Sequence, residues 1–189
     1  MSQHTALLDA NVLYPAPMRD LLLQLAVTDL FRAKWTADIH KEWINALMRN
    51  QPHRDRNALE RTRDLMDRAT RDALITNYEP LIEGLKLPDE GDRHVLAAAI
   101  VGRCDVIGTQ NLKHFPAETL ASLGIAVQHP DAFLARQIAL APGLFCNAVH
   151  KVRSRLNNPP ISVQDYPGTL TRQGLVETVA ELEHYAAVL

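Results

Sequence analysis

The chain contains short runs in which residues are apolar or alternate between apolar and polar. Longer stretches separate these runs, and in them apolar residues recur at the spacing of one helix face. Short apolar runs bounded by turn residues are typical of strands buried within a parallel sheet. The pattern predicts strands at residues 5–8, 31–35, 74–76, 104–109 and 125–128. Because helical stretches separate these strands, we expect an α/β fold in which a mostly parallel central sheet is sandwiched by helices.

The longest unbroken apolar run, Val95–Val101, predicts a buried helix with Asp92 at its start. A helix that leads into a parallel strand runs antiparallel to that strand, so its N-terminus lies at the edge where the strands end. Open α/β sheets bind ligands at that edge. Asp92 is therefore placed either to cap the helix, as aspartate commonly does, or to take part in chemistry.

Other polar side chains are expected at the same edge. Asp9 ends the first strand, Glu42 lies in the first turns of the helix after 31–35, and Thr109 and Asn111 follow the strand at 104–109. Two carboxylates 4 Å apart repel each other by about 4 kcal/mol at an effective dielectric near 20, and a divalent cation would relieve this repulsion. Oxygen ligands favour magnesium or manganese over zinc. Taken alone, Glu42 could instead belong to a solvated helix face and have no part in such a cation site.

A charged helix is predicted over residues 54–71, where arginines alternate with acidic residues. Arg54, Arg61 and Arg68 are spaced seven apart and share one stripe, which could contact phosphates. The usual explanation of such a segment is an exposed helix with local ion pairs.

After residue 130 strand signals fade and three helices are predicted, at 131–140, 143–156 and 162–187. We therefore divide the chain into a domain at 1–135 and a C-terminal helical extension at 136–189. The extension is either a cap on the domain or an arm for a partner.

Composition narrows these expectations in three ways. Lys and Arg total 20 against 22 Asp and Glu, so the net charge neither indicates nor excludes a nucleic-acid partner. The cysteines, Cys104 and Cys146, form neither a metal-binding spacing nor a disulfide framework, and we expect reduced core thiols. No secretory pattern opens the chain and no apolar run approaches the roughly 20 residues that cross a bilayer, so we expect a cytoplasmic protein without a membrane partner.

Four segments carry a resemblance to a known family. They are Asp9–Pro15, Ile39–Trp43 with Glu42, Asp92–Ala99 and Thr109–Pro116. In order and spacing they resemble the PIN-domain ribonucleases, and most closely the toxin half of bacterial VapBC-type toxin-antitoxin pairs. The resemblance covers about residues 5–135, and the helical tail is similar to an extension found in one branch of that family.

The resemblance implies a PIN-like fold and an endoribonuclease that depends on Mg²⁺ or Mn²⁺, is inhibited by a cognate antitoxin and forms a homodimer. Asp9 and Asp92 match the metal ligands of the family, and Glu42 matches the acid of its second motif. All three are thus the implied catalytic residues. Asn11, Thr109 and Asn111 match the polar residues that support them.

His114 departs from the family pattern, which usually has aspartate just before the phenylalanine of the last motif. This leaves the fourth acidic ligand open. If the imidazole reaches the metal, we expect manganese to be favoured over magnesium, because manganese accepts nitrogen more readily. Otherwise His114 faces solvent or a neighbour. Asp89 and Glu90 either compensate in part or are solvated turn residues.

Two other functional classes share part of this pattern. Haloacid-dehalogenase phosphatases also place an aspartate after a first strand, but this chain has Asn11 and Leu96 where that family has acidic residues. The second alternative is a catalytically silent PIN domain that binds RNA or an antitoxin, and it stays open because of His114.

Overall fold

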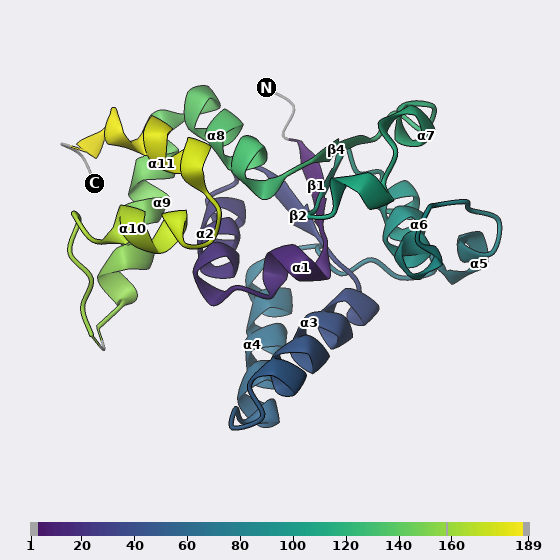
Figure 1. The fold of residues 1–189 in the computed structure, drawn as a ribbon, viewed down its shortest axis with the longest axis horizontal. Coiled ribbons are helices and arrows are strands. Elements are labelled where there is room, and N and C mark those ends of the chain that lie inside the picture. The colour runs from purple at the N-terminus through teal and green to yellow at the C-terminus, as the bar shows by residue number, and fades with distance from the viewer. Residues whose placement is uncertain (1–3, 158, 187–189) are drawn as a thin grey trace. The chain divides into compact units, whose positions relative to one another are not determined.

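A computed structural model describes residues 4–157 and 159–186 (Figure 1). The chain forms two compact units that are not consecutive in sequence. The first contains the residues up to Tyr14 and Phe31–His129, and the second contains Pro15–Leu30 and the residues from Pro130 on. The predicted boundary at residue 135 stays a prediction.

The first unit is built on a sheet of four strands in the order β2-β1-β3-β4, and every pairing is parallel. The strands are β1 (Thr5–Leu8), β2 (Arg32–Lys34), β3 (Val106–Gly108) and β4 (Ala126–Gln128). The predicted α/β class is confirmed. The strand predicted at 74–76 is wrong, because Leu74 makes only an isolated parallel bridge to Trp35.

Helices and short 3₁₀ turns connect these strands. They are α1 (Ala10–Leu13), α3 (Ala37–Asn50), α4 (Arg56–Ala69), α5 (Glu79–Ile82), η1 (Glu90–Asp92), α6 (Arg93–Val101), η2 (Leu112–His114) and α7 (Ala117–Ala121). Thr36 caps α3 by accepting the Ile39 amide at 3.0 Å. The small side chains Ala97–Ala99 are fully buried and let α6 lie close to β1 and β3.

A buried hydrogen-bond network fixes α3 beside α4, and Figure 1 shows the two helices side by side. The indole Nε1 of Trp35 donates to Oδ1 of Asp67 at 2.7 Å. The indole of Trp43 donates to Nδ1 of His40 at 3.0 Å, so Nδ1 is an acceptor and the proton of a neutral ring lies on Nε2. That nitrogen is 3.1 Å from the same Asp67 oxygen. The network holds the helix that carries Glu42.

The second unit is helical. It contains α2 (Ala16–Val27), α8 (Pro130–Leu140), α9 (Pro142–Arg155), α10 (Tyr166–Thr171) and α11 (Val176–Glu183). Helix α2 packs on α9 and α10, while α11 packs on α8. Asp131 of α8 accepts the backbone amides of Glu177 and Thr178 at 2.9 and 2.8 Å and so caps α11.

The single helix predicted at 162–187 is wrong within the described residues. The helical conformation is interrupted between α10 and α11 at Gly174. The φ of this glycine, 81°, is in the left-handed region that glycine adopts without strain. No helix in the described part of the chain has the length and apolar character needed to cross a membrane.

Candidate metal centre at the carboxyl edge of the sheet

Asp9 lies directly after β1, and its side chain is 4% exposed. Oδ1 accepts the Ala10 amide at 2.6 Å, which caps α1. Oδ2 accepts the Thr109 hydroxyl at 2.7 Å and the Asn11 amide nitrogen at 2.6 Å. The carboxylate is therefore held at the edge of the sheet by residues from two strand ends.

Thr109 and Asn11 are themselves oriented by the loop after β3. The Asn111 backbone amide donates to the Thr109 hydroxyl oxygen at 3.0 Å, which leaves the hydroxyl proton for Asp9. The Gln110 amide donates to Oδ1 of Asn11 at 2.9 Å, which fixes the side-chain amide with its nitrogen toward Asp9. The structure thus brings together Asp9, Asn11 and Thr109, while Asn111 contributes a backbone group. Gln110 was not predicted from the sequence.

The charges of Asp92 and Glu42 act on the Asp9 carboxylate. Burial raises the pKa of Asp9, the hydrogen bonds from Thr109 and Ala10 lower it, and the charges of Asp92 and Glu42 raise it further, so that the pKa is above its usual value. Asp9 therefore lies within electrostatic reach of both other acids, which come from α3 and η1. Such a concentration of negative charge is what a divalent cation offsets.

Glu42 is paired with His94, a residue of α6 that sequence reasoning missed. Nε2 of His94 lies 2.8 Å from Oε1 of Glu42. Burial lowers the pKa of His94, but Glu42, then Asp38 and Asp9, outweigh burial and raise it. A polar residue at the start of an otherwise apolar helix was the available signal.

His114 lies beside Asp92. Nδ1 of His114 is 2.7 Å from Oδ2 of Asp92 and 3.8 Å from Oδ2 of Asp89. The donor atoms of the three residues all lie within 4.8 Å of one another. Glu90 turns away and pairs with Arg93. Of the two acidic turn residues considered as substitutes, only Asp89 joins this cluster.

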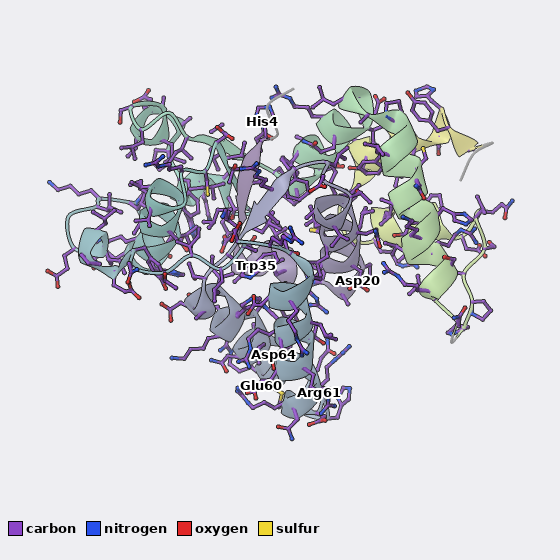
Figure 2. All side chains as sticks on the ribbon, turned by 180° about the vertical axis from the view of Figure 1, so that it is seen from behind. His4, Asp20, Trp35, Glu60, Arg61 and Asp64 are labelled. Carbon is purple, nitrogen blue, oxygen red and sulfur yellow. The ribbon has the colours of Figure 1, made fainter. Side chains whose placement is uncertain are left out.

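Arg54, Arg61 and Arg68, the three arginines of the predicted stripe, are exposed, and each interacts with a residue nearby in the sequence. Arg54 donates to Gln51, Arg61 pairs with Asp55 at 3.5 Å, and Arg68 donates to the carbonyl of Asp64. Figure 2 shows Arg61 on α4 with Glu60 and Asp64. This is the arrangement of a solvated helix with local ion pairs, and contact with RNA stays a prediction.

Comparisons with known proteins match both parts of the chain. A family model described as PIN domain matches residues 5–113, and one described as VapC50 C-terminal domain matches residues 130–184. A Mycobacterium tuberculosis protein named "Putative ribonuclease VapC50" is 55% identical over 49 residues, which are 26% of this chain and 29% of the relative. The matched segment thus spans less than a third of that relative. No solved structure gives a significant match.

Proposed function

The chain belongs to the PIN domain family, and from that premise we propose that it is a Mg²⁺- or Mn²⁺-dependent endoribonuclease and the toxin of a toxin-antitoxin pair. The observation that carries the proposal is the buried Asp9 carboxylate, which Thr109 and Asn11 hold at the carboxyl edge of the sheet within electrostatic reach of Asp92 and Glu42. The VapC50 C-terminal domain match at 130–184 supports assignment to the toxin branch.

The donor set fits a hard divalent cation. Carboxylate oxygens with neutral polar support are the ligands that Mg²⁺ and Mn²⁺ prefer. Asp9, Glu42 and Asp92 would hold the ion, and its charge would offset the burial and the neighbouring acids that raise the pKa of Asp9. When bound, the ion would lower the pKa of a coordinated water and neutralise charge on the leaving phosphate oxygen.

The protein's own residues prepare the carboxylates for this role. Among the residues that the structure describes, Oδ2 of Asp9 accepts two side-chain donors, whereas Oδ1 accepts only the Ala10 amide. Since each carboxylate oxygen accepts about two hydrogen bonds, Oδ1 keeps a free lone pair for a ligand. The donors from Thr109 and Ala10 also favour the charged form of Asp9. His94 holds the Glu42 carboxylate in one place.

The same premise leads to proposals about partners and compartment. We assign the protein an RNA substrate, a cognate antitoxin and a homodimeric state, and we place its activity in the cytoplasm. Arg54, Arg61 and Arg68 would contact the RNA backbone, which predicts binding that weakens with salt.

A second candidate function is a catalytically silent PIN domain that holds RNA or an antitoxin. The observation that favours it is the contact of His114 with Asp92, which engages an oxygen of a predicted ligand. Magnesium titration by calorimetry separates the two candidates, because a silent site would show no binding at millimolar concentration.

The test of the nuclease proposal is cleavage of total RNA by the parent and by Asp9→Asn in Mg²⁺, with a chelator control. We expect the variant to lose more than about 100-fold in rate, since even partners that only orient a metal ligand contribute about 10–100-fold. Glu118→Gln, an exposed acid on α7, is the matched control for loss of one charge and should cleave normally. Equal rates for Asp9→Asn and the parent would contradict the mechanism.

A further inference from the structure

The cluster of Asp89, Asp92 and His114 combines two carboxylates with an imidazole nitrogen. We propose that these three residues form a nitrogen-containing divalent cation site that takes Mn²⁺ in preference to Mg²⁺. The inference deepens the proposed function and rests on it in one respect, because Asp92 is shared with the Asp9 and Glu42 carboxylates.

The spacing of the donor atoms suits one ion. Neighbouring ligands of an octahedral ion with bonds of about 2.1 Å lie about 3 Å apart, and opposite ligands about 4.2 Å apart. Nδ1 of His114 lies 2.7 Å from Asp92 and 3.8 Å from Asp89, and all three donors lie within 4.8 Å. Side-chain shifts of less than about an ångström would bring them onto one ion.

Both segments that carry the donors are anchored. Oδ1 of Asp89 accepts the Gly91 amide at 2.8 Å, which leaves Oδ2 facing His114. On the other side, the His114 backbone amide donates to the Asn111 carbonyl at 3.0 Å, and the next residue, Phe115, is fully buried. The donors are thus held in place, while exposed fractions of 22–53% leave them open to an ion and to a phosphate.

The chemistry of the donors sets the preference. Mn²⁺, like Mg²⁺, favours oxygen ligands but is a transition-metal ion that also accepts imidazole nitrogen, whereas Mg²⁺ gives up its water reluctantly. A neutral imidazole in place of a carboxylate also removes one negative charge, which weakens the attraction for Mg²⁺ more than for an ion that accepts nitrogen. The site should therefore discriminate between two ions that an all-carboxylate site would bind more evenly.

A different arrangement could use the same contacts, namely a protonated His114 that bridges the two carboxylates in place of an ion. The two arrangements differ in one observable. Only a metal site puts a ring nitrogen in direct contact with Mn²⁺.

Pulsed electron paramagnetic resonance of the full chain with bound Mn²⁺ tests for that contact through ¹⁴N modulation, at one fixed pH. We expect modulation in the parent, its loss in His114→Asp, and its retention in His94→Gln, which controls for the other imidazole near the carboxylates. Asp89→Asn should lower Mn²⁺ affinity about tenfold. Parent protein without ¹⁴N modulation, or modulation that survives His114→Asp, overturns the proposal.

The result is separable from the fate of the proposed function. Nitrogen coordination without RNA cleavage would leave the site standing and remove the nuclease. Magnesium-dependent cleavage by a protein whose bound Mn²⁺ shows no nitrogen would keep the nuclease and remove the site. Circular dichroism of each variant verifies that it is folded.

Discussion

Thr109 is the residue on which the position of the Asp9 carboxylate most depends. Its hydroxyl donates to Oδ2 of Asp9 and is itself oriented by the Asn111 amide. Thr109→Val keeps the shape of the side chain but removes the donor. We expect about 10–100-fold weaker binding of Mn²⁺ by calorimetry, as for other groups that orient a ligand. Thr109→Ser keeps the hydroxyl and should bind like the parent. Unchanged affinity in the valine variant would show that Asp9 needs no such support.

At this scale the sequence was informative about some residues and silent about others. Asp9 and Asp92 could be placed because strand ends and helix starts follow from the local apolar pattern. His94 and Asp89 could not, because their contacts depend on side-chain rotamers across separate elements. His114 was left open for the same reason: its position in the loop gives no direction for the ring.

Among the elements, the pair α3 and α4 decides where Glu42 lies, and Asp67 joins them by accepting from both Trp35 and His40. Asp67→Ala would leave two buried donors without partners, at a cost of about 1–3 kcal/mol each. We therefore predict a loss of about 2–6 kcal/mol in the free energy of unfolding, measured in urea.

Asp64→Ala is the matched control, because Asp64 lies on the same helix and pairs at the surface with Arg63. It should change the free energy of unfolding by less than about 0.5 kcal/mol. If both alanine variants unfold at the same urea concentration, Asp67 does not join the two helices as described.

Helices and strands were predicted correctly where the apolar residues have a clear spacing or a capping residue marks the start. The predictions were wrong where contacts between distant segments determine the structure. The strand at 5–8 and the helix beginning after Thr36 follow from local pattern and capping. The segment at 74–76 had β-forming residues but pairs with Trp35 at one bridge only. The turn between α10 and α11 is made by Gly174, a residue that the sequence pattern alone places within one continuous helix.

Over the whole molecule, the two cysteines report separately on the two units. Cys104, in the first unit, is 4% exposed, and burial raises its pKa to about 12. Cys146, on α9 in the second unit, is 3% exposed, and burial raises its pKa as well. Since the thiolate is the reactive form, both thiols should react with a disulfide reagent at least about 100-fold more slowly in the native protein than in denaturant.

Cys104→Ser and Cys146→Ser leave one reporter each, so the reaction can be assigned to a unit. If either variant is labelled rapidly and stoichiometrically without denaturant, the unit that contains its remaining cysteine is more open than described.

The membership of α2 in the second unit was beyond sequence reasoning. Its apolar stripe predicts only that one face is buried, whereas the choice of α9 and α10 as partners depends on packing between segments far apart in the chain. The succession of short strands and helices, by contrast, was sufficient to predict the parallel sheet and the edge that carries the carboxylates.

The central claim, that Asp9, Glu42 and Asp92 together form one cation site, is tested most directly by metal-dependent thermal stability. Binding to the folded state alone stabilises it by about 2.7 kcal/mol when the free ion is at 100 times its Kd. We predict that Mn²⁺ raises the melting temperature of the parent and of Glu118→Gln, relative to chelator, clearly more than that of Asp9→Asn or Asp92→Asn. An equal rise in all four proteins would contradict the account.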